Sequence, residues 1–154
     1  MKNIMFVCTG NICRSAMAEF LFKKKISERG LLGNVKICSA GTYAYDGDVP
    51  TYEGLSVMKS FYGIDMSNHK ATPIRNADVQ EMDLILCMTY SHKSTLDMMY
   101  PEIKNRIFLL KEYVNAGHEI DDPYGYGMDI YKSCAKEIDE CLDLLLEKEF
   151  GGVK

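Results

Sequence analysis

The chain has 154 residues, of which 47% are hydrophobic and 26% charged, a composition typical of a globular protein with enough residues for one sizeable core. We therefore expect residues 1–154 to form a single domain. The formal net charge of −4 argues against a nucleic-acid-binding protein, because such proteins usually carry a basic surface. No run approaches the roughly 20 apolar residues that span a bilayer, and no secretory signal is visible, so we expect a cytoplasmic protein that does not bind membranes.

Four short apolar segments predict the strands of a sheet that is buried on both faces. Three of them are nearly continuous apolar runs, which are typical of parallel strands covered by helices on both sides. The segments are NIMFVC (3–8), VKICSA (35–40), DLILCM (83–88) and RIFLL (106–110).

Segments with helical spacing of apolar residues lie between these strands and after the last one. Gly30, Gly63 and Pro101 follow the first three of them, at positions where helices commonly end. The predicted helices are 15–29, 53–62, 91–100 and 128–150. Strands that alternate with helices predict an α/β fold, a three-layer sandwich with a central four-stranded parallel sheet flanked by helices on both faces.

The last predicted helix carries an apolar stripe that we expect to face the core, and Gly151-Gly152 is expected to end it. The stripe consists of Ile130, Cys134, Ile138, Cys141, Leu142 and Leu145.

The segment VCTGNICRS (7–15) joins the first predicted strand to the first predicted helix, and its two cysteines admit three interpretations. A zinc site would need a second pair of ligands, and no Cys or His pair complements Cys8 and Cys13. A thioredoxin-like redox pair would need two residues between the cysteines, whereas four are present. The third interpretation, Cys8 followed after five residues by Arg14, is a phosphate-binding loop.

Such a loop suits anion chemistry because it opens a helix at the carboxyl end of a strand. There, backbone N–H groups and the helix dipole form a cradle for an anion. Gly10 and Asn11 tolerate the left-handed backbone that a tight loop requires. Arg14 can bind two phosphate oxygens, and a thiolate at Cys8 would be a stabilised nucleophile. The spacing alone occurs often by chance, so an ordinary buried cysteine at a strand end remains the alternative interpretation.

Longer motifs point to a family. VCTGNICRS resembles the phosphate-binding loop of the low-molecular-weight protein tyrosine phosphatases, and DDPYGYG (121–127) resembles the loop that supplies their general acid. SAGT (39–42), GIDMSNHKA (63–71) and LILCM (84–88) resemble family segments in the expected order. The resemblance covers nearly the whole chain. It implies hydrolysis of phosphotyrosine through a phosphocysteine intermediate, without a metal or another cofactor.

The resemblance also implies individual roles at the reaction centre. Cys8 is the nucleophile, and Arg14 binds the phosphoryl oxygens. Asp122, directly before Pro123, is the general acid and then the general base. Asp121 is a competing candidate for that role, because either carboxylate could supply a proton.

Further roles concern the loop itself. Ser15 hydrogen-bonds the thiolate. Cys13 is either an ordinary small loop residue or, as the resemblance favours, a resolving cysteine that protects Cys8 by forming a reversible disulfide with it when it is oxidised. The residues that surround the phosphoryl group are Thr9, Gly10, Asn11, Ile12, Cys13 and Ser15, and those that support the loop are Asn11, Ser39 and His69. We assign no role to His92 or His118.

Substrate choice is expected to depend on Ile12, Tyr45 and Tyr124, which align with the walls of the family's substrate slot. Relatives that act on phosphoarginine tend to carry threonine at the position of Ile12, so isoleucine favours phosphotyrosine. We expect a phosphotyrosine-containing protein as the partner, with a tyrosine kinase among the candidates, and a monomeric or weakly self-associating chain.

Three alternatives remain. Protein arginine phosphatases resemble this loop. Arsenate reductases share it too, but they need two further cysteines for a disulfide relay, and Ser94 stands seven residues after Cys87 where the second would lie. A non-catalytic phosphate-binding module would not need an acid such as Asp122 beside Cys8 and Arg14.

Overall fold

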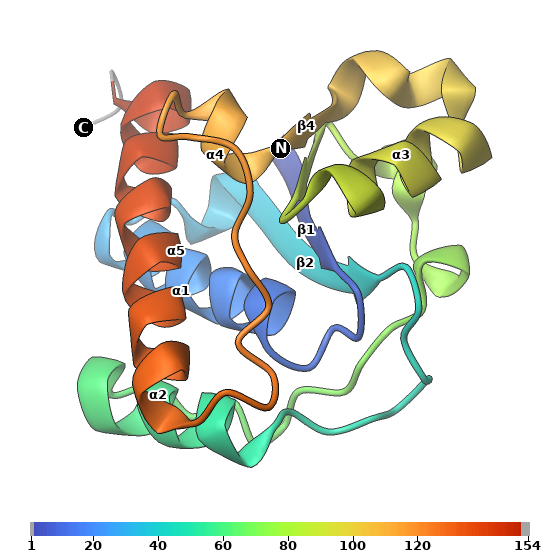
Figure 1. Ribbon diagram of the computed structural model, residues 1–154. Coiled ribbons are helices and arrows are strands. Elements are labelled where there is room, and N and C mark those ends of the chain that lie inside the picture. The colour runs from blue at the N-terminus through green and yellow to red at the C-terminus, as the bar shows by residue number, and fades with distance from the viewer. Residues whose placement is uncertain (1, 152–154) are drawn as a thin grey trace.

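The computed structural model describes residues 2–151 and has a four-stranded sheet at its centre (Figure 1). The strands lie in the order β2-β1-β3-β4, and each neighbouring pair is parallel. Their bounds are Lys2–Cys8 for β1, Val35–Gly41 for β2, Leu84–Cys87 for β3 and Ile107–Leu109 for β4. The four predicted strands and their parallel arrangement are thereby confirmed.

All four predicted helices are present, with ends that differ by no more than one residue. The helices are α1 (Arg14–Glu28), α2 (Tyr52–Tyr62), α3 (Tyr90–Met99), α4 (Leu110–Tyr113) and α5 (Met128–Phe150). The single turn α4 was not predicted, because four residues are too few to show helical periodicity. Gly63 ends α2 with a left-handed φ of 65°, as expected for a glycine stop. Gly151 follows α5, and Gly152 lies outside the described residues.

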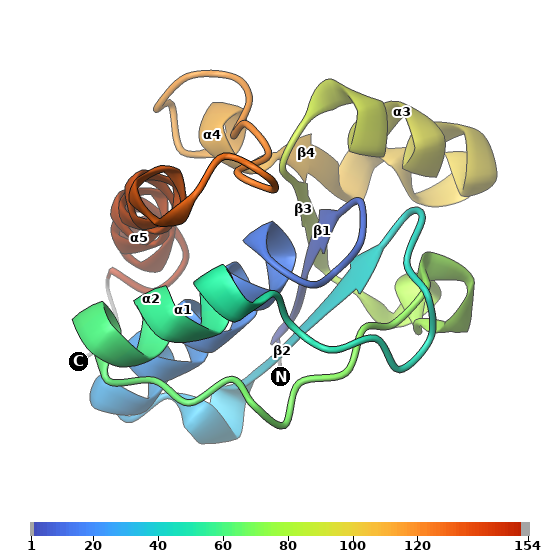
Figure 2. The ribbon, with the colours of Figure 1, turned by 60° about the horizontal axis from the view of Figure 1, so that its bottom comes forward.

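The helices form two layers, one on each face of the sheet, which confirms the three-layer prediction. Helices α1 and α5 cover one face with α2 packed against α5, and α3 lies on the other side of the sheet (Figures 1 and 2). Within residues 2–151, no helix combines the length and the apolar character that crossing a bilayer requires.

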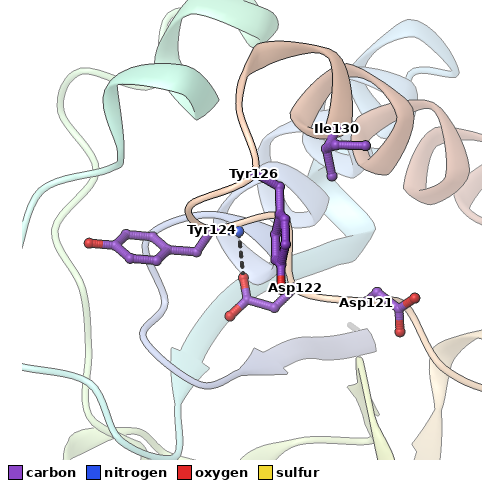
Figure 3. Close-up of a pocket in the computed structure, with 5 residues that line it drawn as sticks. All are labelled: Asp121, Asp122, Tyr124, Tyr126 and Ile130. Carbon is purple, nitrogen blue, oxygen red and sulfur yellow. Dashed lines mark hydrogen bonds between the residues drawn. The ribbon is translucent and has the colours of Figure 1, made fainter.

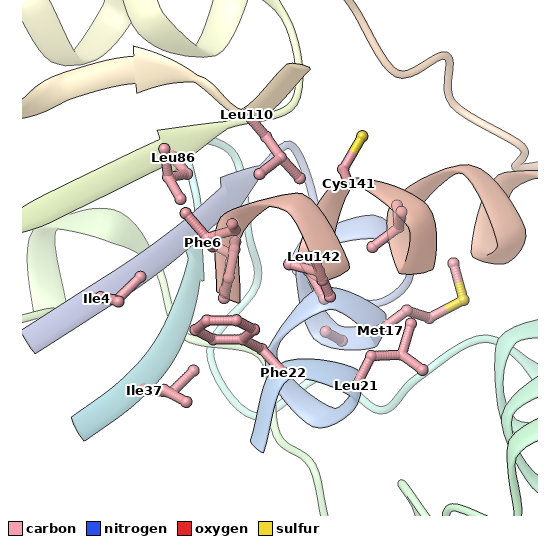
Figure 4. Close-up of a cluster of buried hydrophobic side chains, with 14 of the residues drawn as sticks. Ile4, Phe6, Met17, Leu21, Phe22, Ile37, Leu86, Leu110, Cys141 and Leu142 are labelled. Carbon is pink, nitrogen blue, oxygen red and sulfur yellow. The ribbon is translucent and has the colours of Figure 1, made fainter. Parts of the chain in front are cut away.

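The strands are apolar almost throughout because each face of the sheet has its own core. Ile4 and Phe6 of β1 belong to the core beneath α1 and α5, where Phe6 meets Phe22 edge to face (Figure 4). Met5 and Val7, which point the opposite way, belong to the second core on the α3 side.

The prediction that Ile130 faces the core is wrong. Ile130 is 46% exposed, whereas the neighbouring Tyr131 is fully buried and takes the inward position in the first turn of α5. Both residues fit the helical spacing to Cys134, at four and three positions, so the periodicity alone could not choose between them.

The strand order also fixes where a ligand can bind. Strand β1 has β2 on one side and β3 on the other. The connection after β1 leads to one side of the sheet and the connection after β2 leads to the other, so the strand order reverses at the carboxyl end of β1. In open parallel sheets this is the position of the binding crevice. The segment that follows Cys8 begins there.

Candidate active site

The loop from Thr9 to Cys13 joins β1 to α1 and turns around the sulfur of Cys8. Asn11 adopts a left-handed backbone with φ of 56°, and its N–H points at Cys8 Sγ from 3.3 Å. Ser15 Oγ lies 2.9 Å from the same sulfur. Because a hydroxyl and a backbone N–H both face Cys8, the site can stabilise negative charge on its sulfur.

A buried polar network holds this loop, and it contains the expected support residues. The Nδ2 group of Asn11 donates to Ser15 Oγ at 2.8 Å and to Ser39 Oγ at 2.9 Å. Its Oδ1 accepts from the N–H of Thr72 at 2.9 Å, and its backbone oxygen lies 2.8 Å from His69 Nε2. All hydrogen-bonding atoms of the Asn11 side chain thus stabilise a conformation that costs free energy in a residue other than glycine.

The network continues to Glu19, a residue that the sequence did not single out. Ser39 Oγ donates to one carboxylate oxygen of Glu19, which is 8% exposed, and Lys23 pairs with the other. A carboxylate can only accept, so the hydroxyl hydrogen of Ser39 is committed to Glu19 and its oxygen accepts from Asn11. The signal in the sequence was position: Glu19 follows Ser15 by four residues and so shares its helix face.

The guanidinium of Arg14 is buried beside the loop, with part of its hydrogen-bonding capacity unused. Nη1 donates to the backbone oxygen of Ile120 at 2.8 Å, and Nη2 lies 3.5 Å from Thr9 Oγ1. Nε is buried and has no hydrogen-bond partner within residues 2–151. A buried N–H without a partner is costly, and an anion held in the loop would satisfy it.

The segment after Ile120 brings one of the two candidate acids to Arg14. Asp122 Oδ2 lies 3.7 Å from Arg14 Nη2, and Asp122 Oδ1 accepts from the N–H of Tyr124 at 3.1 Å. In Figure 3 the side chains of Asp121 and Asp122 point to opposite sides. Asp122 therefore faces the loop, with half of its side-chain surface exposed.

The expected wall residues lie on separate segments that border the loop. Tyr124 lines a hollow with Asp122 and Tyr126 (Figure 3). Tyr45 lies on a second segment, which is attached to the loop by the N–H of Tyr43 donating to Thr9 O at 2.9 Å. All of these tyrosine side chains are exposed, so their rings are free to contact a substrate. No site role was predicted for Tyr43 or Tyr126.

Ile12 and Cys13 differ in how accessible they are. Ile12 is half-buried, whereas Cys13 is 5% exposed with its Sγ 3.8 Å from Asp122 Oδ1. Burial, together with the negative charges of Cys8 and Asp122, raises the pKa of the Cys13 thiol well above its ordinary value. None of the six cysteines, which all lie within residues 2–151, forms a disulfide.

His92 was left without a role, yet it is buried and its Nε2 lies 2.8 Å from Thr9 Oγ1. His118 is exposed at the surface, where it contacts Glu112. Thr89 and His92 have the spacing of a helix-capping pair, and this spacing was the only indication in the sequence that His92 has a structural role.

Comparison with known proteins decides the family. A family model described as low molecular weight phosphotyrosine protein phosphatase matches residues 3–150. The chain belongs to this family. As a low-molecular-weight phosphatase it is a hydrolase of phosphoric monoesters whose substrates are phosphoproteins.

Relatives with two different names are similarly close to this phosphatase. A protein-arginine-phosphatase of Bacillus subtilis is 37% identical over 95% of both chains. The human low molecular weight phosphotyrosine protein phosphatase is 38% identical over 96% of this chain and 95% of its own. The crystal structure of a low molecular weight protein tyrosine phosphatase from T. tengcongensis matches with a TM-score of 0.91 and 40% identity, covering 96% of this chain and 99% of that one.

Gly41 offers a test of how tightly the loop is fitted against the sheet of this phosphatase. A Cβ added at Gly41 would lie 2.4 Å from the backbone oxygen of Thr9 and 3.0 Å from the backbone nitrogen of Asn11. We expect Gly41→Ala to lower the free energy of unfolding by about 1–3 kcal/mol and to weaken inhibition by inorganic phosphate, because the loop backbone must move. Gly33→Ala is the matched control, since its Cβ would meet no atom of residues 2–151 within 4 Å. Equal urea unfolding curves and phosphate inhibition for the two variants would contradict this prediction.

Proposed function

We propose that this phosphatase hydrolyses phosphotyrosine in proteins through a phosphocysteine intermediate. The observation that supports this most strongly is the buried Nε–H of Arg14 beside the sulfur loop, which has no hydrogen-bond partner among the described residues 2–151. A phosphoryl group above Cys8 would accept from Nε and Nη2 in the bidentate manner that arginine favours. The loop N–H groups and the N-terminus of α1 would add their positive potential at the same place.

In the first step, the Cys8 thiolate attacks phosphorus and the bond from phosphorus to the phenolic oxygen breaks. Asp122 gives its proton to that oxygen, so tyrosine leaves as a neutral phenol. Arg14 and the loop N–H groups stabilise charge on the phosphoryl oxygens in the transition state. The position of Asp122 near Arg14, at 3.7 Å, supports this assignment over Asp121.

In the second step, the Asp122 carboxylate takes a proton from water while the water oxygen attacks phosphorus. The bond from phosphorus to sulfur breaks, and the products are inorganic phosphate and the Cys8 thiolate. The Ser15 hydroxyl, 2.9 Å from the sulfur, would stabilise the departing thiolate. Asn11, Ser39 and His69 are proposed to keep the loop in the conformation that both steps use.

Replacing the nucleophile tests the covalent mechanism. Cys8→Ser should retain inorganic phosphate binding, because the cradle is unchanged, and should lose turnover of para-nitrophenyl phosphate, because a serine hydroxyl is not activated here. Titration calorimetry with phosphate and the steady-state assay, both without added metal, measure the two properties. Full activity in Cys8→Ser would exclude a phosphocysteine intermediate.

Replacing the acid tests the role of Asp122. Asp122→Asn should lower kcat about 10²- to 10⁴-fold on a substrate with a poor leaving group such as phenyl phosphate, because proton donation is lost. The loss should be smaller on para-nitrophenyl phosphate, whose leaving group needs the proton less. Asp121→Asn is the matched control and should leave both rates nearly unchanged. Equal losses on the two substrates would remove Asp122 from the acid role.

Arginine dephosphorylation is the second candidate function, because a protein named for it is among the similar relatives. The half-buried Ile12 supports tyrosine instead. An isoleucine at the loop mouth offers apolar contact to a phenyl ring, whereas it offers no hydrogen bond to a guanidinium group.

Ile12 therefore allows a specificity test. Ile12→Thr should raise the ratio of kcat/KM on phosphoarginine to kcat/KM on phosphotyrosine peptides by about tenfold, because a hydroxyl replaces an apolar branch. Ile12→Val is the control, since valine has nearly the shape of threonine without its hydroxyl. A ratio that changes equally in both variants would show that size, rather than polarity, decides.

We further propose that Cys13 protects Cys8 from irreversible oxidation. A peroxide converts the Cys8 thiolate to a sulfenic acid, and the Cys13 thiolate attacks that sulfur, releasing hydroxide and forming a disulfide. Burial is the main cause of the raised pKa of Cys13, and the negative charge of Cys8 is the second. Conversion of Cys8 to the neutral sulfenic acid removes that repulsion, so Cys13 becomes easier to ionise when its thiolate is needed.

Mass mapping after mild peroxide treatment tests this protection. We expect the Cys8–Cys13 disulfide as the main product, with a yield that rises with pH because a larger fraction of Cys13, whose pKa is raised by burial, is then ionised. In Cys13→Ser, Cys8 should proceed to the sulfinic acid. Sulfinic Cys8 beside free Cys13 as the main product of the unaltered protein would contradict the proposal.

Arsenate reduction has less support. Cys87 is fully buried at the end of β3, where burial raises the pKa of its thiol, and Ser94 cannot continue a disulfide relay.

We infer that residues 1–154 act as one domain, monomeric or weakly self-associating, on phosphotyrosine-containing proteins, with tyrosine kinases among the candidates. The cysteines without disulfides are consistent with a reducing compartment such as the cytoplasm.

A further inference from the structure

We propose that His92 is a positioning residue for phosphate binding: it fixes the side chain of Thr9, which in turn holds the guanidinium of Arg14. This support reaches the loop from α3 and is separate from the Asn11 network. The inference rests on the proposed role of Arg14 as the phosphate-binding residue.

The backbone N–H of Thr89 determines which ring nitrogen of His92 carries the hydrogen. Its N–H lies 3.1 Å from His92 Nδ1 and can only donate, so Nδ1 must carry a lone pair. A neutral imidazole with an unprotonated Nδ1 carries its hydrogen on Nε2. His92 Nε2 therefore donates to Thr9 Oγ1, at 2.8 Å.

The ring stays in this neutral form because of its surroundings. His92 is 3% exposed, and burial, followed by the positive charge of Arg14, lowers its pKa to about 4. At neutral pH a single tautomer is thus selected, and it presents a donor to Thr9.

Thr9 passes this constraint to the arginine. Its hydroxyl oxygen has two lone pairs, of which one accepts from His92 Nε2 and the other faces Arg14 Nη2 at 3.5 Å. Without His92, the exposed Thr9 side chain could turn to solvent, and the guanidinium would lose a contact on the edge that binds an anion.

The second holder of Arg14 comes from the same part of the fold. Nη1 donates to Ile120 O, and the N–H of Ile120 donates to Met88 O at 2.9 Å. Met88 follows β3 directly and precedes the capping residue Thr89. The segment after β3 therefore anchors both Nη groups of Arg14, while Nε has no hydrogen-bond partner in the part of the chain that the structure describes.

His92 also occupies the capping box of α3, so an experiment must separate capping from positioning. Glutamine and glutamate both serve at this capping position, because each can accept from the Thr89 N–H. Only glutamine can also donate to Thr9. We expect His92→Gln to keep the inhibition constant of inorganic phosphate within about threefold of the unaltered protein, and His92→Glu to weaken it about tenfold or more at an equal urea midpoint.

A double-mutant cycle with uncharged substitutions avoids the effect of the charge that glutamate introduces. His92→Leu and Thr9→Val should each weaken phosphate inhibition, and the double variant should be no weaker than Thr9→Val alone, because both break one chain of contacts. Arg14→Ala is the reference: if it leaves phosphate inhibition unchanged, the proposed function itself is wrong. If Arg14→Ala abolishes inhibition, either equal inhibition in His92→Gln and His92→Glu or additive losses in the cycle would overturn the role of His92 alone.

Discussion

The left-handed backbone of Asn11 is the constraint on which the site depends. A residue other than glycine in this conformation costs about 1–3 kcal/mol, and it persists only where its surroundings determine it. Here the same conformation turns the N–H of Asn11 toward the Cys8 sulfur while its side chain bonds to Ser15 and Ser39. One residue thus shapes the loop and orients the Ser15 hydroxyl beside the Cys8 sulfur.

The network around Asn11 is buried, and each side chain that links the Cys8 sulfur to the surface has hydrogen-bond partners. The donor and acceptor roles in each hydrogen bond determine those in the next, along a chain that runs from Ser15 through Asn11 and Ser39 to Glu19. At the surface, Lys23 forms an ion pair with Glu19. Partly satisfied networks are costly in a low-dielectric interior, so removing any member would affect its neighbours as well. This is why a loop with little regular structure can hold a fixed geometry.

The sequence predicted the framework well, and the reason is physical. Continuous apolar strands and glycine stops are local signals, and Cys8, Arg14 and Asn11 lie within one short segment. Glu19 and His92 offered only their spacing to Ser15 and to Thr89, and this spacing could not reveal their roles, because the roles depend on partners 20 and 83 residues away that only the folded sheet brings near. Ile130 was misplaced because two adjacent residues fit the same helical spacing.

The anchoring of Asp122 differs from that of the sulfur loop, and the difference decides which positions near the site tolerate substitution. Asp122 lies half exposed on a segment with left-handed glycines at Gly125 and Gly127, whereas Cys8 and Arg14 are buried. Ile120 and Asp122 of this segment contact Arg14, whereas the side chains of Tyr124 and Tyr126 are exposed, so substitutions of these two tyrosines change the surface beside Asp122 and leave the contacts with Arg14 in place. The fold therefore places an exposed rim beside a buried loop, and side chains of the rim can be exchanged at a much lower cost in stability than those of the loop.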